Sequence, residues 1–221
     1  MQESLFIIGP PSNDTFRTYR DAELVAGSLG TPSKMPGLSY GIPASRCITG
    51  ATLVKIEGSV CSGCYALKGR YVFPNVQKAQ ERRFQSLRHP RWVAAMAFMI
   101  QKKKETYFRW HDSGDLQGIW HLANIVAVAQ RCPDTKFWLP TREKGTVRSY
   151  LQNFGAFPQN LVVRISATMV GNEAGTEFPN TSSVVRTKDQ ATCPAYKQHN
   201  VCGDCRRCWD PAVRNVAYPI H

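Results

Sequence analysis

Strand-like apolar runs alternate with helix patterns in the middle of the chain, and this alternation limits the fold more than any other feature. The runs begin near residues 107, 136 and 161, with helical patterns over residues 117–131 and 146–154 between them. A parallel strand connection needs a crossover of a dozen or more residues, which this spacing supplies. The sequence therefore predicts an α/β fold of parallel βα units that form a partial or distorted TIM-like barrel.

Weaker patterns extend this assignment in both directions. Two helices are expected before the βα units, at residues 75–87 and 90–104. Four shorter elements complete the prediction: strands 5–8, 52–56 and 183–185, and a helical turn at 21–26. A chain of 221 residues suits one domain. We divide residues 1–221 into an N-terminal segment (1–74), the βα units (75–185) and a Cys-rich C-terminal extension (186–221).

Composition narrows the cellular setting and the class of partner. Hydrophobic residues make up 43% of the chain and charged residues 20%, as in ordinary globular proteins. No apolar run is long enough to cross a bilayer, so we expect no membrane association and a place in the cytoplasm. The net charge of +12 suits nucleic acid or another polyanion as a partner, and a solvated basic face accounts for it equally well.

The C-terminal extension contains a compact set of thiols. Cys193 is followed by an unbroken C-x2-C-x2-C run, Cys202, Cys205 and Cys208. In a reducing cytosol such clusters indicate metal ligation rather than disulfides. A C-x2-C-x2-C run with one distant cysteine is typical of [4Fe-4S] ligation, and structural zinc is the alternative, with His199 able to replace a thiol.

A second set of thiols lies in loop-like sequence near the N-terminus: Cys47, Cys61 and Cys64. Three cysteines with no evident fourth suit a cubane in which one iron is open to a small molecule. In the alternative, Cys61 and Cys64 complete the C-terminal site and Cys47 is a packed thiol. The sequence leaves open whether one cluster or two are present. Cys132, at a helix end, is expected to be an ordinary packed thiol.

Polar residues follow the predicted strands, where parallel α/β folds place their functional groups. Asp112 and Asp115 come after the first strand and Arg142 after the second, and we take them as catalytic candidates. Asp115 has an alternative role as the N-cap of helix 117–131. Arg164 lies inside an apolar strand and needs a partner, either Asp112 or the metal thiolates.

Tyr65 and Lys68 flank the first cysteine pair. With Arg164 they are the candidates for cofactor binding.

Several of these motifs together resemble the phage-encoded "gene product 88" domain family. They are Lys34-Met-Pro-Gly-Leu-Ser-Tyr-Gly-Ile-Pro-Ala, Cys47-Ile-Thr-Gly-Ala-Thr, Cys61-Ser-Gly-Cys-Tyr-Ala-Leu-Lys-Gly and Cys202-Gly-Asp-Cys-Arg-Arg-Cys-Trp. The resemblance covers roughly residues 32–221. It implies a bacteriophage or prophage origin, hence the cytoplasm of a bacterial host, and it brings no reaction with it.

A second resemblance is to the radical S-adenosylmethionine superfamily, whose incomplete βα barrel carries a three-cysteine loop after its first strand. Cys61-Ser-Gly-Cys64-Tyr65 is similar to the end of that loop, and Asp112-Ser-Gly-Asp115 occupies the place of its Gly-rich acidic segment. The resemblance implies S-adenosylmethionine as a cofactor. Two departures count against it: thirteen residues rather than three separate Cys47 from Cys61, and the acidic segment lacks paired glycines.

The sequence thus predicts an iron–sulfur protein of phage origin with a redox or cluster-dependent enzymatic role on an unknown substrate. An electron donor or a small molecule would be its partner. The rival hypotheses are a zinc-stabilised nucleic-acid-binding protein and a metal that serves folding alone, with an active pocket at Asp112 and Arg142.

Overall fold

The computed structural model describes residues 15–220, and the strand expected at residues 5–8 lies outside them. Its centre is a six-stranded sheet in which every neighbouring pair is parallel and the strands follow one another in chain order. The strands are β1 (Leu38–Tyr40), β2 (Tyr107–Trp110), β3 (Lys136–Thr141), β4 (Leu161–Ser166), β5 (Thr181–Val185) and β6 (Asn215–Pro219). β1 and β6 form the two edges, so the sheet is open.

Helices fill most of the connections. The α-helices are α1 (Tyr19–Ala26), α2 (Ile48–Leu53), α3 (Pro74–Ser86), α4 (Trp92–Lys103), α5 (Ile119–Arg131) and α6 (Lys144–Phe154). Short 3₁₀ turns are η1 (Ala44–Arg46), η2 (Tyr65–Leu67), η3 (Gly69–Val72), η4 (Lys188–Gln190), η5 (Pro194–Lys197) and η6 (Arg207–Trp209). None of the helices within residues 15–220 is long and apolar enough to cross a membrane.

Local chemistry sets several helix starts. Thr18 and Asp21 form a reciprocal capping box at the start of α1, in which each side chain accepts a hydrogen bond from the other residue's backbone N–H. Pro74 opens α3, where its missing N–H costs nothing and its fixed φ suits the first turn.

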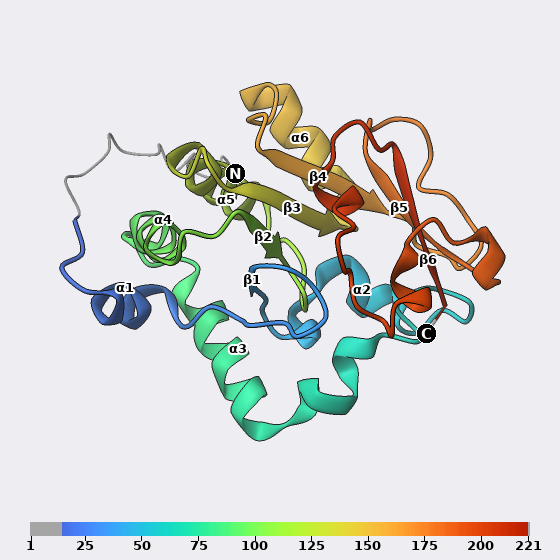
Figure 1. Cartoon of the computed structure of the whole chain (residues 1–221), viewed down its shortest axis with the longest axis horizontal. Helices are drawn as coiled ribbons and strands as arrows, with labels where there is room; N and C mark the ends of the chain where they lie inside the picture. Colours follow the sequence, from blue (N-terminus) through green and yellow to red (C-terminus); the bar gives the residue numbers. More distant parts are fainter. Residues whose placement is uncertain (1–14, 221) are drawn as a thin grey trace, which may run out of the picture.

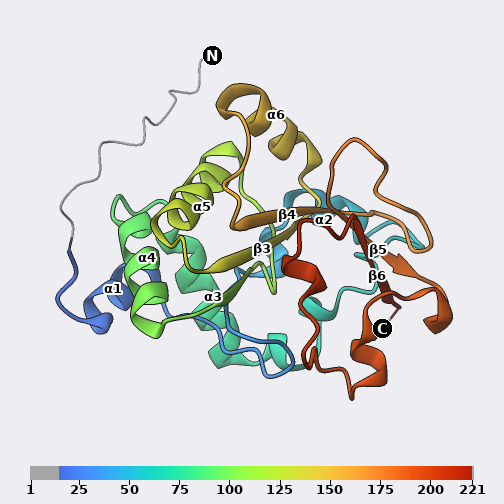
Figure 2. The ribbon, with the colours of Figure 1, turned by 45° about the horizontal axis from the view of Figure 1, so that its top comes forward.

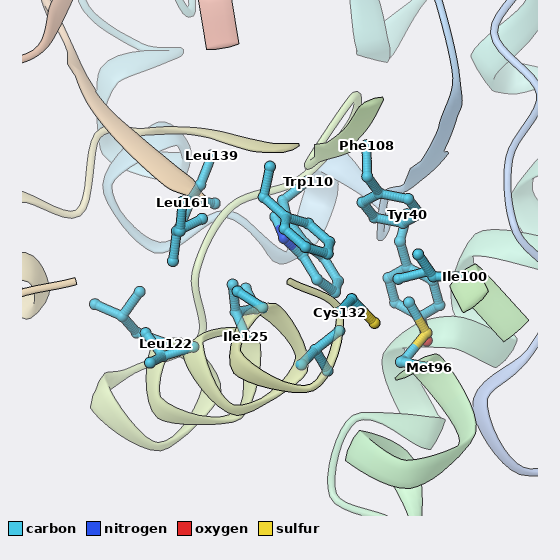
Figure 3. Packing of buried hydrophobic residues seen from close by; sticks show 14 of the residues in the cluster. Tyr40, Met96, Ile100, Phe108, Trp110, Leu122, Ile125, Cys132, Leu139 and Leu161 are labelled. Carbon is cyan, nitrogen blue, oxygen red and sulfur yellow. The ribbon is translucent and has the colours of Figure 1, made fainter. Parts of the chain in front are cut away.

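The main core lies between one face of the sheet and the helices. Alternate strand residues such as Phe108, Trp110 and Leu139 point to this face and pack on α4 and α5, as Figure 3 shows with Ile100 and Ile125. Trp110 and Phe137 stack within this core, with ring centroids 6.1 Å apart.

The opposite face of the sheet is covered by the C-terminal segment. In Figures 1 and 2 the red chain that leads to β6 runs along the side of the sheet away from α4 and α5. Trp138 points to this face and packs with Trp209, Cys208 and Val216 in a second, smaller core. The Cys-rich segment therefore forms one layer of the fold.

The α/β prediction with a parallel sheet is confirmed, and strands 107–110 and 161–166 have the expected bounds. The barrel is not confirmed, because the sheet stays open. A strand at residues 52–56 is wrong: Thr52 and Leu53 end helix α2 and a turn follows. β1 and β6 lie in segments where no strand was expected.

Candidate functional site

The first cysteine group comprises Cys47, Cys61 and Cys64. Cys47 is the N-cap of α2, shortly after β1. Its thiol and that of Cys61 face one point beside α2, since a Cβ added to Gly50 would lie 3.5 Å from Cys47 Sγ and 3.8 Å from Cys61 Sγ. Glycine at this position therefore keeps the space between the two thiols open.

These thiols share one electrostatic neighbourhood. Burial, together with the charges of Asp115, Cys64 and Cys61, raises the pKa of Cys47 to about 12. Burial also raises the pKa of Cys61, while the guanidinium of Arg142 lowers it. Cys47 and Cys61 are therefore neutral thiols near pH 7 without a metal, and a metal that binds here displaces their protons.

Two contacts hold the first cysteine group at the carboxyl ends of the strands. The carboxylate of Glu143, directly after β3, accepts hydrogen bonds from Thr49 N at 2.8 Å and Thr49 Oγ1 at 2.9 Å. On the other side, Val60 N donates to the carbonyl oxygen of Thr168, which follows β4, at 2.8 Å. The loop that carries these thiols therefore extends across the carboxyl ends of the strands from β1 to β4. The sequence analysis gave no role to Glu143.

Asp115 joins the ends of β2 and β3. Its carboxylate accepts hydrogen bonds from Leu116 N at 2.8 Å, Thr141 Oγ1 at 2.5 Å and Arg142 N at 2.9 Å. The interpretation of Asp115 as a helix cap is wrong, because these donors occupy its oxygens and Gly118 is the N-cap of α5. Burial raises the pKa of Asp115 to about 6, against the opposing effect of the Thr141 hydrogen bond.

Asp112 is held by two tyrosines. Its carbonyl oxygen accepts from Tyr65 Oη at 2.7 Å, and its Oδ2 accepts from Tyr71 Oη at 3.2 Å. Its Oδ1 is buried and has no hydrogen-bond partner among the residues described. Tyr65 therefore ties the first cysteine group to the end of β2. The side chain of Lys68, the other expected cofactor contact in this loop, is exposed.

The second cysteine group comprises Cys193, Cys202, Cys205 and Cys208. Burial raises the pKa of Cys202, and Cys193 and Cys205 raise it further. Burial raises the pKa of Cys208 to about 11, although a contact of 3.1 Å between its Sγ and Tyr218 Oη lowers it. The thiols of the C-terminal segment thus raise one another's pKa and form a set separate from the first cysteine group.

The main chain of this segment is fixed to distant parts of the fold. Cys193 N donates to Ala217 O on β6 at 3.0 Å, and Cys202 N donates to Lys34 O, upstream of β1, at 2.8 Å. The segment before β1 and the C-terminal segment therefore meet at the second cysteine group.

Arg164, in the strand β4, binds the main chain of the same segment. It is fully buried in β4, and its hydrogen bonds in the described part of the chain go to carbonyl oxygens, without a contact to Asp112. These acceptors are the main chain of Thr181, Arg207, Cys208, Asp210, Val213 and Arg214. The charge is thus solvated by backbone dipoles, which satisfies a buried cation without a carboxylate.

Arg109 lies between the two cysteine groups, a position that the sequence analysis missed. Its Nη2 donates to Tyr65 Oη at 3.1 Å, beside Cys64. On the other side its charge opposes the rise in pKa that burial causes at Cys202 and Cys208. One half-buried cation therefore lies next to both groups.

Two histidines lie beside candidate residues: His111 precedes Asp112, and His199 lies between Cys193 and Cys202. His111 is buried, and its ring packs against His121 with centroids 5.3 Å apart. Burial lowers the pKa of both rings, so they are neutral. His199 is exposed.

The two groups are neighbourhoods of thiols rather than finished coordination shells. All cysteines are free thiols. Within residues 15–220, no three His, Cys, Asp or Glu side chains are close enough together to hold a metal ion as they stand. Cys132 lies apart in the main core, where its Sγ contacts Ala97 O at 3.7 Å, as expected of a packed thiol.

Comparison with known proteins gives one match. The family model described as Gene product 88 matches residues 15–211, most of the chain and both cysteine groups. No curated protein and no solved structure matches the chain. The resemblance to the radical S-adenosylmethionine superfamily thus has no support, whereas the expected phage protein family is confirmed. The chain belongs to the Gene product 88 family.

Proposed function

We propose that this chain is an iron–sulfur protein with two separate centres. The first cysteine group would hold one centre and the second cysteine group the other. The strongest support is the division of seven thiols into two sets. The first cysteine group lies at the carboxyl ends of the strands, and the second lies in the segment that covers one face of the sheet.

The first centre is the reactive one. Three thiolates leave one iron of a cubane free to bind a small molecule, which is the chemistry the group supplies. Gly50 keeps the space beside Cys47 and Cys61 clear. Arg142 lies near the same thiols, and its Nε is buried without a partner among the described residues. That cation favours an anionic substrate, such as a carboxylate or a phosphate.

Asp115 supports this site through the turn that follows β3. Its hydrogen bond to Arg142 N fixes the turn that presents the guanidinium. Asp112 positions Tyr65 and Tyr71 beside the same loop.

The second centre is the electron reservoir. Four thiols provide a complete ligand set, so this centre has no open position for a substrate. Trp209 and Tyr218 would shield it, and the half-buried Arg109 and the buried Arg164 would offset the negative charge of four thiolates. Arg109 also reaches Tyr65 beside the first cysteine group, so the two centres are neighbours.

Metal and sulfide analysis of anaerobically purified protein tests the proposal. Brown protein that contains iron and acid-labile sulfide, with a visible band that bleaches on reduction, is the expected result. Colourless protein with stoichiometric zinc would contradict it and favour zinc in the second cysteine group. In the brown protein, Cys205→Ala is expected to lose part of the iron, and unchanged iron would exclude the C-x2-C-x2-C run as a ligand set.

A further inference from the structure

Exposed apolar side chains gather around the first cysteine group. Most of the large hydrophobic residues that are exposed in the described chain lie between residues 48 and 73: Ile48, Ile56, Tyr65, Leu67, Val72 and Phe73. Phe73 is 53% exposed and Leu67 47%. A folded chain leaves such side chains in water singly, whereas a concentration of them marks a binding surface. We call these six exposed apolar residues the apolar rim.

The apolar rim belongs to the loop that carries the thiols. Ile48 directly follows Cys47, and Tyr65 directly follows Cys64. The turns η2 and η3, which present the other members, contact each other. A partner on this surface would therefore lie only a few residues from the first cysteine group.

The stretch that contains η2 and η3 is basic, although the exposed Glu57 follows Ile56. No Asp or Glu occurs between Glu57 and Glu81. In the same stretch Lys68, Arg70 and Lys78 are exposed. An apolar centre with a basic border complements an acidic surface, which steers association and fixes orientation.

The side-chain types distinguish a protein partner from nucleic acid. Single-stranded nucleic acid is bound by aromatic platforms on which bases stack, and protein–DNA interfaces are polar. Four members of the apolar rim are aliphatic instead: Ile48, Ile56, Leu67 and Val72. Aliphatic side chains offer bases no stacking, but they pack well in the core of a protein–protein interface.

We propose that the apolar rim is the docking surface for an acidic electron-carrying protein that reduces the centre in the first cysteine group. The docking follows from exposure and charge, and only the electron transfer rests on the proposed function. The basic border attracts the carrier, and the apolar centre excludes water where the two proteins meet.

Binding of an acidic flavodoxin to the anaerobically purified full chain, measured by calorimetry, tests this proposal. Affinity is expected to fall steeply between about 50 mM and about 500 mM salt. Lys68→Glu with Arg70→Glu is expected to weaken binding about tenfold or more at low salt. Leu67→Ser with Phe73→Ser is expected to weaken it at both salt concentrations, since apolar contacts are not screened.

A matched control changes the same net charge elsewhere. Lys102→Glu with Lys104→Glu alters the exposed end of α4, outside the apolar rim. Binding within about twofold of the unaltered protein is expected. An equal loss in this control, or no flavodoxin binding at all, would overturn the docking proposal. So would a single-stranded oligonucleotide that binds through Lys68 and Arg70 and displaces the flavodoxin.

The outcomes separate this inference from the proposed function. Iron that dithionite reduces, in a protein that binds no flavodoxin, leaves the function standing and refutes the docking surface. Protein without iron that binds flavodoxin through the apolar rim supports the surface and refutes the iron–sulfur proposal. Iron together with flavodoxin binding and faster reduction of the visible band supports both.

Discussion

The guanidinium of Arg164, inside β4, donates from Nε to the carbonyl oxygen of Cys208 at 2.9 Å. The two residues are 44 positions apart in the sequence. The same side chain donates to Arg207 O and Asp210 O at 2.8 Å and 2.7 Å. A strand cation thus sets the path of the segment that carries the second cysteine group.

Replacing this cation is expected to release the C-terminal segment. Arg164→Met leaves several buried carbonyl oxygens without donors, at a cost of at least about 3 kcal/mol in the free energy of unfolding. Urea denaturation measures the loss, and limited proteolysis is expected to cut within residues 186–214. Arg148 is the matched control, because it is exposed and its ion pair with Glu177 is 2.7 Å long. Arg148→Met is expected to leave the free energy of unfolding nearly unchanged, and equal losses would contradict this role of Arg164.

Filling the space beside Gly50 is expected to disturb the first cysteine group alone. In Gly50→Ala the new methyl group lies 2.8 Å from Cys47 Cβ, so the loop must shift. We expect iron to fall in the first centre and to stay in the second, as followed by iron analysis and EPR spectra. Gly63→Ala is the control in the same loop, since a Cβ there meets nothing within 4 Å. Unchanged iron in Gly50→Ala would show that the space is not used.

Glu143 is expected to hold Cys47 in place through Thr49. Glu143→Leu leaves Thr49 N without an acceptor, at a cost of about 1–3 kcal/mol, and frees the start of α2. Alkylation of Cys47 in the metal-free protein, followed by mass spectrometry, is then expected to be faster. Glu143→Gln retains an amide oxygen for Thr49 N and is expected to keep the slow rate. Equal rates in both variants would mean that Glu143 does not position the loop.

The buried histidines predict how stability depends on pH. Burial lowers the folded-state pKa of His121 to about 3 from 6.5, and lowers that of His111 as well. The unfolded chain therefore binds protons that the folded chain does not bind as pH falls below 6.5. The contribution of His121 is complete above pH 6.5 and is lost toward pH 3, with a slope of about 1.4 kcal/mol per pH unit, and His111 adds a loss in the same direction.

Urea denaturation at several pH values between about 4.5 and 7.5 measures this slope. His121→Gln keeps an acceptor for Gln117 N, which now donates to His121 Nδ1 at 3.3 Å, and is expected to remove one histidine's share. His89→Gln, at an exposed position, is the control and is expected to leave the slope unchanged. A slope that persists in His121→Gln would contradict the assignment.

Periodicity predicted the strands whose burial pattern is regular. β2, β3 and β4 are made mainly of apolar residues, and they appear where expected. Residues 52–56 have the β-branched composition of a strand, yet the bond from Thr49 N to Glu143 starts a helix just before them. That contact joins positions 94 apart, so local propensity could not reveal it.

The candidate site was predictable in its residue types and not in its grouping. Strand ends pointed to Asp115 and Arg142, which do lie near the first cysteine group. The separation into two groups depends on which face of the sheet the C-terminal segment covers. Contacts between residues far apart in the sequence decide that, and local patterns do not reveal them. Arg109 had a readable signal, since it alternates with Phe108 and Trp110 and so points away from the main core.

Iron and acid-labile sulfide in two cysteine variants test the two-centre account most directly. One variant replaces Cys47, Cys61 and Cys64 by serine, and the other replaces Cys202, Cys205 and Cys208. The account predicts about eight iron atoms per chain in the unaltered protein and about four in each variant, with a distinct EPR spectrum remaining in each. Loss of all iron in either variant, or stoichiometric zinc in place of iron, would contradict it.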